Sequence, residues 1–253
     1  MLEINENIYG HKNRLDWFKK FIKKEQSGLE FGCGTGTMIT GILSQEGYCI
    51  RGIDLDTDSI NLGKEIFTEN NISIDKLICD DLKNMPDESY DYIIASEVFE
   101  HIPDEVLDDI FELIKKKIKP NGLLLVTVPN GYGWFEFEDF IWKKLKVGYI
   151  IQTLKINSII GRIKKLFIGE YVDSKYPSSI ADSPHVQRFT LNSIINKLEN
   201  LDFKQFDSRG STLFSGPFSN MFFTGIKTVM YFNIKLGEVF PSFSSGFYIA
   251  FKK

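Results

Sequence analysis

Short apolar runs alternate with amphipathic stretches along the first half of the chain. The spacing of apolar and charged positions predicts helices over residues 11–24, 37–46, 57–70 and 104–118. Apolar runs of the kind that forms buried parallel strands lie between them, at residues 28–31, 48–53, 77–79, 92–95 and 123–128. Strand and helix alternate five times in about 130 residues, which predicts a doubly wound α/β sheet.

The pattern changes after Pro129. Residues 132–184 are first aromatic and then basic and lack strand alternation, whereas a helix at 191–201 and strands at 203–208 and 246–251 resume the pattern. A second apolar stretch, residues 217–236, separates those last two strands. We interpret both stretches as insertions that cover the carboxyl edge of the sheet, where ligands bind in this architecture.

The composition of the two insertions leaves their roles open. The basic part of 132–184 is consistent with a solvated helix face, a lid over a ligand or an interfacial contact with a membrane. The Phe-rich stretch 217–236 is consistent with core packing, a dimer surface, an apolar ligand pocket or a membrane-facing helix. A monomer and a homodimer are both compatible with the sequence.

Composition and charge exclude several classes of protein. Apolar residues make up 43% of the 253 residues, enough for a large core, and the net charge of −4 disfavours nucleic acid as the main partner. The three cysteines form no CxxC pair, which indicates free thiols in a reducing compartment. We expect a cytoplasmic protein, because the first residues lack a signal core and no stretch of 18 uncharged apolar residues occurs.

A glycine turn follows the first predicted strand. Gly32, Gly34 and Gly36 lie between that strand and a helix. Because glycine has no side chain, the backbone at such a turn can approach a nucleotide-like ligand closely. Asp54 closes the next strand, 18 residues past Gly36, and a carboxylate there accepts both hydroxyls of an adenosine ribose. Thr37 replaces the small residue that the dinucleotide fingerprint requires beside a pyrophosphate.

These motifs resemble those of the class I S-adenosylmethionine-dependent methyltransferases. The run from Leu29 to Thr37 is similar to the first motif of that family, and Asp54 with Leu55 to its acidic second-strand end. Asp80 and Asp81 lie in a stretch, Cys79 to Leu82, that resembles the one whose aspartate meets the adenine. The resemblance implies a seven-stranded, mostly parallel Rossmann-like sheet and a cofactor site made of Glu30, Phe31, Gly32, Cys33, Gly34, Gly36, Asp54, Leu55, Asp80, Asp81, Leu82, Ser96 and Glu97.

The same resemblance implies that residues 1–253 form one methyltransferase domain. Residues 1–131 are then the cofactor-binding core, 132–184 a helical insertion or lid, and 185–253 the completion of the sheet, with the apolar insertion at 217–236. Pro129 and Asn130, at the end of the fifth strand, are expected to face the same cleft.

The run Glu97 to His101 contains the pattern ExxEH. On a helical turn its carboxylates and imidazole share one face, and a further histidine, His185, follows later in the chain. The pattern resembles that of the ubiquinone-pathway O-methyltransferases and the small-RNA 2′-O-methyltransferases, in which it holds a divalent ion. The resemblance implies Mn²⁺, Fe²⁺ or Mg²⁺ on Glu97, Glu100, His101 and His185. Metal-free catalysis by His101 or His185, with Glu97 at the cofactor, and purely structural roles are the alternatives; His11 is expected to be exposed or to touch the acceptor.

The expected activity is transfer of a methyl group from S-adenosylmethionine, leaving S-adenosylhomocysteine, to an oxygen of a small-molecule or glycan-linked acceptor. Ser96 and Glu97 do not begin the Asn/Asp-Pro-Pro-aromatic tetrad typical of amino-group acceptors on nucleobases. N- or C-methylation of a small metabolite is the alternative. The Lys-, Ile- and Asn-rich composition suggests a bacterial source and surface polysaccharide biosynthesis. Tyr171 and Lys175 match the YxxxK of NAD-dependent dehydrogenases, a remote alternative because the accompanying glycine loop is missing.

Overall fold

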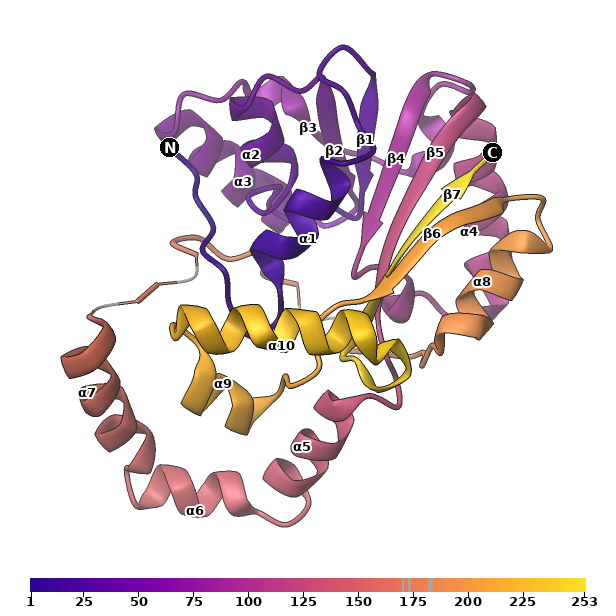
Figure 1. Ribbon diagram of the computed structural model, residues 1–253. Coiled ribbons are helices and arrows are strands. Elements are labelled where there is room, and N and C mark those ends of the chain that lie inside the picture. Colours follow the sequence, from indigo (N-terminus) through magenta and orange to yellow (C-terminus); the bar gives the residue numbers. More distant parts are fainter. Residues whose placement is uncertain (170, 173, 182–183) are drawn as a thin grey trace.

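A seven-stranded sheet of order β3-β2-β1-β4-β5-β7-β6 forms the centre of the computed structural model, which describes residues 1–169, 171–172, 174–181 and 184–253 (Figure 1). Its strands are β1 (Gly28–Phe31), β2 (Ile50–Asp54), β3 (Leu77–Cys79), β4 (Tyr90–Ser96), β5 (Ile118–Pro129), β6 (Lys204–Gly210) and β7 (Gly246–Lys252). The first five pair in parallel, and β7 runs antiparallel to both β5 and β6. The predicted fold, a mostly parallel seven-stranded sheet, is confirmed.

Helices cover both faces of the sheet. One face packs against α1 (His11–Phe18), α2 (Thr40–Gln45) and α3 (Thr57–Glu69), and the other against α4 (Asp104–Lys117) and α8 (Leu191–Glu199). Alternation along β4 explains the division, since Tyr92 and Ile94 belong to the first core and Ile93 and Ala95 to the second. All four of these residues are buried, as expected of a strand covered on both sides.

Several predicted elements have different ends in the structure. The helix expected over 11–24 ends at Phe18, because the amides of Lys20 and Phe21 bond to carbonyls three residues back and turn the chain. The helix expected from 37 begins only at Thr40, whose amide bonds to the carboxylate of Glu30 and leaves the preceding residues in the glycine turn. The other predicted helices over 57–118 end one residue early, and α8 ends at Glu199.

The bounds of the strands also differ from those predicted. The strand expected at 48–53 is β2, which spans Ile50–Asp54, and β4 is longer than the expected 92–95. The strand expected at 123–128 reaches back to Ile118, with an irregular register between Tyr90 and Tyr92 of β4. Short 3₁₀ helices complete the connections, η1 (Ile74–Lys76), η2 (Leu82–Asn84), η3 (Phe99–His101) and η4 (Pro241–Phe243).

The two irregular stretches of the sequence are helical. The first contains α5 (Trp134–Lys143), α6 (Val147–Thr153) and α7 (Ile156–Ile168), and the second α9 (Pro217–Phe223) and α10 (Lys227–Val239). Figure 1 shows α5, α6 and α7 as an arc that projects from the carboxyl end of the parallel strands, with α9 and α10 between the arc and the sheet. Helix α9 contacts both α5 and α7, so the two insertions pack on one another.

Candidate functional site

A cavity of about 820 Å³ opens at the carboxyl ends of β1, β2 and β4. Twelve of the thirteen residues expected at the cofactor line this cavity, namely Glu30, Phe31, Gly32, Cys33, Gly34, Asp54, Leu55, Asp80, Asp81, Leu82, Ser96 and Glu97. The thirteenth, Gly36, lies outside the lining. The three catalytic candidates, His101, His185 and Glu97, all lie in this lining. The sheet therefore brings together residues from the ends of β1, β2, β3 and β4, and His185 joins them from the segment before α8.

The glycine turn needs its glycines for two reasons. Gly32 and Gly34 have φ angles of 69° and 55°, in the left-handed region that residues with side chains rarely adopt. A side-chain carbon on Gly32 would overlap Val98, and one on Gly34 would overlap the carbonyl oxygen of Ser178. Gly36 faces away from the cavity, because a side chain there would collide with Leu77. Gly36 thus serves the packing of α3 and β3 behind the turn.

Asp54 ties the glycine turn to the end of β2. Its Oδ2 accepts a hydrogen bond from the amide of Gly34 at 2.7 Å, and its Oδ1 accepts one from the amide of Asp56 at 2.9 Å. Each carboxylate oxygen retains a further lone pair for a ligand hydroxyl. The neighbouring Leu55 is 72% exposed and presents an apolar side chain to the opening of the cavity.

Asp80 and Asp81 lie side by side at the end of β3. Asp80 accepts hydrogen bonds from the side chain of Asn84 and the amide of Asp81, both at 2.7 Å. Asp81 caps η2 by accepting from the amide of Lys83 at 2.9 Å. These hydrogen bonds hold the pKa of each carboxyl below its usual value. Both side chains therefore face the cavity as acceptors only.

Glu30 and Cys33 lie buried beneath the glycine turn. Burial raises the pKa of Glu30 to about 7, although its carboxylate accepts bonds from the amide and hydroxyl of Thr40 at 2.9 Å and 2.5 Å. Burial likewise raises the pKa of the Cys33 thiol. A carboxyl in this position fixes the start of α2 relative to β1 and supports the turn from below.

Glu97 marks the end of β4. Its backbone has a φ of 55°, and its amide donates to the carbonyl of Thr127 at 2.9 Å. The hydroxyl of Thr127 donates to its carboxylate at 2.9 Å, and the guanidinium of Arg14 lies 3.4 Å from the same oxygen. The side chain is thereby held at the cavity wall beside Arg14, which also lines the cavity.

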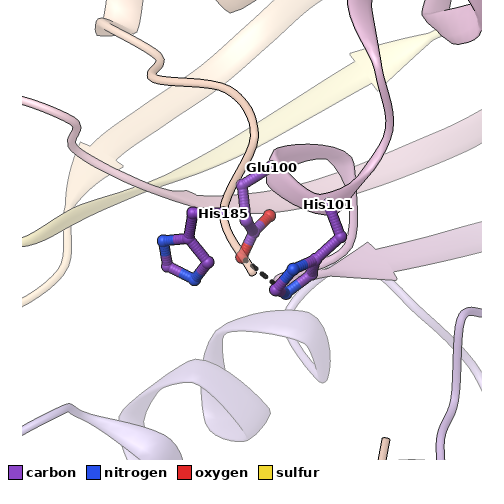
Figure 2. Close-up of side chains that lie close together, drawn as sticks. All are labelled: Glu100, His101 and His185. Carbon is purple, nitrogen blue, oxygen red and sulfur yellow. Dashed lines mark ion pairs between the residues drawn. The ribbon is translucent and has the colours of Figure 1, made fainter. Parts of the chain in front are cut away.

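The second half of the ExxEH pattern meets the later histidine. Glu100, His101 and His185 present ligand atoms that all lie within 4.8 Å of one another. Figure 2 shows the three side chains close together. His101 Nε2 is 3.8 Å from Glu100 Oε1, while its Nδ1 lies 3.2 Å from the carbonyl oxygen of Pro184. Glu97 is not part of this group among the described residues, since its carboxylate faces Arg14 and Thr127.

The environment of Glu100 is unusual for a carboxylate. The side chain is 1% exposed, and its Oε2 atom has no hydrogen-bond partner among the described residues. Burial, together with the charge of Glu97, raises its pKa above the usual range. The pKa of His185 is lowered by partial burial and by His101. An unpaired buried carboxylate oxygen and two nearby imidazoles are donors of the kinds that bind divalent cations, so these three side chains could hold one.

Other expected residues lie elsewhere. The side chain of Asn130 was expected in the cleft, but it donates to the carbonyls of Ser242 and Ser244 and is absent from the lining, whereas Pro129 is present. His11 is half-buried in the cavity wall, not exposed. The Tyr171 hydroxyl donates to the carbonyl of Glu6, and Lys175 contacts Tyr176, so these two do not form the catalytic pair of a dehydrogenase.

The sequence reasoning missed part of the lining. A segment of the first insertion lies across the glycine turn, where the amide of Thr35 donates to the carbonyl of Ser178 at 2.9 Å and Ile180 donates to Ser59 at 3.1 Å. Arg14, Tyr9 and Tyr248 also line the cavity. The one available signal was Arg14, a basic residue on the same predicted helix as the buried Leu15 and Phe18. Nothing in the local pattern distinguishes the others.

The profile of a family described as "Methyltransferase domain" matches residues 9–206 of the chain. The chain belongs to this methyltransferase family. The match spans the glycine turn, the acidic strand ends, the ExxEH run and the first insertion. It confirms the resemblance to class I S-adenosylmethionine-dependent methyltransferases on which the cofactor site was predicted.

Curated relatives of this methyltransferase differ in the atom that they methylate. The chain is 29% identical over 139 residues to the ubiquinone biosynthesis O-methyltransferase of Rickettsia bellii, covering 54% of this chain and 50% of the relative. It is 30% identical over 153 residues to phosphoethanolamine N-methyltransferase 2 of Caenorhabditis elegans, covering 58% and 34%. The chain thus spans half or less of the length of these relatives.

Solved structures agree on the fold. A methyltransferase from Archaeoglobus fulgidus, described as dependent on S-adenosylmethionine, superposes with a TM-score of 0.57 over 96% of this chain and 92% of that one, at 18% identity. The phosphoethanolamine N-methyltransferase 2 of Haemonchus contortus, in complex with S-adenosylmethionine, superposes with a TM-score of 0.55 at 17% identity, over 96% of this chain and 52% of that one.

Proposed function

We propose that this methyltransferase transfers the methyl group of S-adenosylmethionine to an oxygen of a small-molecule or glycan-linked acceptor. The observation that carries the proposal is the convergence of the glycine turn, Asp54 and the Asp80–Asp81 pair on one cavity of about 820 Å³. The family match supports the cofactor, and the ubiquinone relatives support an oxygen acceptor.

Each part of the cavity has chemistry suited to one part of the cofactor. Gly32 and Gly34 allow the ligand to approach the backbone, and Asp54 accepts hydrogen bonds from the ribose hydroxyls. Asp80 or Asp81 accepts from the adenine amino group. Arg14, 13% exposed in its side chain, is the cation beside the turn and pairs with the methionine carboxylate.

The protein contributes to the reaction mainly by positioning the acceptor and removing its proton. The methyl group on a sulfonium is already activated, so the protein positions the acceptor oxygen in line with it and removes the acceptor proton. In the absence of a metal, His101 and His185, which lie in the cavity wall, are the groups suited to take that proton. The bond from sulfur to carbon breaks as the bond from oxygen to carbon forms, which leaves S-adenosylhomocysteine.

The group of Glu100, His101 and His185 fits a divalent metal. The nitrogen and oxygen donors favour Mn²⁺ or Fe²⁺ over Mg²⁺. His101 Nδ1 contacts the carbonyl of Pro184, so Nε2 is the atom through which this residue would hold a metal. A bound metal would lower the pKa of an acceptor hydroxyl. Glu97, expected as a fourth ligand, lies at the adjoining wall, where its carboxylate contacts Arg14 and Thr127.

A second candidate function is methylation at nitrogen or carbon. It is supported by the phosphoethanolamine relative and by a sphingolipid C9-methyltransferase of Candida albicans, 28% identical over 136 residues and matching 51% of this chain and 26% of the relative. We favour oxygen, because the chain at the end of β4 reads Ser96, Glu97, Val98 and lacks the tetrad typical of methyltransferases that act on nucleobase amino groups. A cytoplasmic location, a bacterial source and a role in surface glycans remain expectations from the sequence.

A calorimetric titration of S-adenosylhomocysteine into chelator-stripped protein tests the proposal. Tight binding without metal, and no heat from NAD⁺, is the expected result. Heat from NAD⁺ alone contradicts the proposal. With the cofactor established, a panel of hydroxyl and amine acceptors and radiolabelled S-adenosylmethionine distinguishes oxygen from nitrogen acceptors.

A further inference from the structure

The segment from Phe140 to Gly169 carries charge of one sign. It contains seven of the thirty basic residues of the chain and none of the thirty-four acidic ones, which leaves a net charge of −11 on all other residues. We call this segment, which includes the end of α5 and all of α6 and α7, the basic arm. We infer that the basic arm docks on the surface of a bilayer that contains anionic lipids.

Helix α7 exposes apolar side chains where a helix of a globular protein normally has polar ones. Ile159, Ile163 and Phe167 follow at intervals of four and share one face with Leu166. All four are exposed, and Leu166 and Phe167 are each 84% exposed. No residue of α7 is buried. The apolar face of this helix therefore has no partner among the described residues.

The apolar surface continues over the rest of the basic arm. Phe140, Leu145, Tyr149 and Leu154 are all more than half exposed, and lysines alternate with them along the chain. Exposed apolar residues interspersed with lysine and arginine are typical of helices that lie in the headgroup region, with apolar side chains inserted and cations at the phosphates. No described helix is long and apolar enough to cross a membrane.

Charge favours a bilayer over a second copy of this chain. A symmetric dimer through the basic arm brings two sets of seven cations together, which is unfavourable. An anionic bilayer attracts the arm and repels the negative remainder of the chain. The charge distribution thus selects both the partner and the orientation in which the protein meets it.

The basic arm adjoins the cofactor cavity. A hollow of about 660 Å³ lies between α7 and α9, lined by Lys164, Lys165 and Tyr9 among others, and Tyr9 also lines the cofactor cavity. Docking of the arm places that cavity beside the bilayer surface. From this placement we infer that the methyl acceptor is carried in or on the membrane. The inference about the acceptor rests on the proposed function, whereas the docking itself does not.

Cosedimentation with vesicles tests the docking. Vesicles of phosphatidylcholine with phosphatidylglycerol are expected to bind the protein, binding is expected to weaken with added salt, and vesicles of phosphatidylcholine alone are expected to bind at least about tenfold less. Replacing Lys143, Lys144 and Lys146 with Gln, or Leu166 and Phe167 with Glu, is expected to reduce the partition coefficient by about tenfold or more.

Matched variants separate docking from general effects of charge. Lys20, Lys23 and Lys24→Gln removes three exposed lysines outside the arm, and Ile74→Glu with Phe206→Glu adds two charges to exposed apolar positions outside it. Both are expected to bind vesicles like the unaltered protein. Titration with S-adenosylhomocysteine confirms that each variant is folded, and it reports on the proposed function independently of the vesicles.

Three results overturn the inference. The first is absence of binding to anionic vesicles at low salt, and the second is binding that the arm variants do not change. The third is a concentration-dependent dimer, seen by sedimentation velocity, that the arm variants abolish while vesicle binding is unaffected, because the arm is then an interface between copies.

Discussion

The guanidinium of Arg14 and the carboxylate of Glu97 lie 3.4 Å apart at the wall of the cofactor cavity. This ion pair joins α1 to the turn after β4, and it lies where Glu97 has a left-handed backbone held by Thr127. Strained backbone of this kind persists when surrounding contacts fix it, and it is concentrated at ligand sites. We infer that the pair holds Arg14 ready for the carboxylate of the cofactor.

Arg14→Ala is expected to weaken the binding of S-adenosylhomocysteine by about tenfold or more, because a charge-assisted hydrogen bond in a half-enclosed cavity is lost. Lys12→Ala is the matched control on the same helix, since Lys12 pairs with Asp16 at the surface. Calorimetry measures both variants. Equal affinities for the two variants contradict the role assigned to Arg14.

Asp54→Ala is expected to abolish detectable binding of S-adenosylhomocysteine, a loss of about a hundredfold or more. The variant loses the acceptor for the ribose hydroxyls and also the bond that holds the amide of Gly34. The unfolding temperature is expected to change little, because Asp54 lies at a strand end outside the core. Asp54→Asn keeps one acceptor oxygen and is expected to bind with intermediate affinity. Unaltered affinity in the Ala variant is the outcome that would refute the cofactor assignment.

The sequence predicted what depends on local pattern and on strand ends. Gly32 and Asp54 were identified because each stands at the end of a predicted parallel strand, and such strand ends meet at one edge of a sheet. Asp80 was identified because its stretch of sequence resembles a motif of the family. The contact of Ser178 with the glycine turn was not predictable, because 143 residues separate Ser178 from Thr35 and the contact uses backbone groups. Spacing grouped Glu97 with Glu100 on one helical turn, but the left-handed backbone at Glu97 separates the two side chains.

The metal proposal predicts that Mn²⁺ binds to chelator-stripped protein and that Glu100→Gln or His185→Ala weakens this binding by about tenfold or more. The removed side chains supply donors to the group in Figure 2. His11→Ala is the control, because His11 is the one histidine of the sequence other than His101 and His185 and does not belong to that group. Calorimetry with Mn²⁺ provides the measurement. If exhaustive chelation leaves turnover unchanged and the protein contains no metal, the proposal is wrong.

Glu138 connects the two insertions, and its loss is expected to loosen them. The buried carboxylate of this α5 residue accepts from Trp134 Nε1 at 2.6 Å and from the amide of Ser219 in the first turn of α9 at 2.9 Å. Glu138→Ala leaves these donors unpaired at a cost of about 2 kcal/mol. Hydrogen exchange is expected to accelerate in α9 and remain unchanged in β4. Glu136→Ala, on the same helix, removes only the exposed pair with Arg188 and is the control; equal exchange in both variants contradicts the connection.

The buried carboxyl of Glu30 predicts a pH dependence of stability. Its pKa is raised from 4.5 to about 7 in the folded protein, so the folded chain holds this proton more tightly than the unfolded chain. The contribution of Glu30 to the free energy of unfolding is therefore fully present below pH 4.5. This contribution, roughly 3 kcal/mol, is lost as the pH rises to about 7. Glu30→Gln keeps an acceptor oxygen for Thr40 and does not titrate. Urea unfolding of both proteins between pH 5 and about 8 is expected to show a decline in the unaltered protein relative to the variant, and parallel curves contradict the prediction.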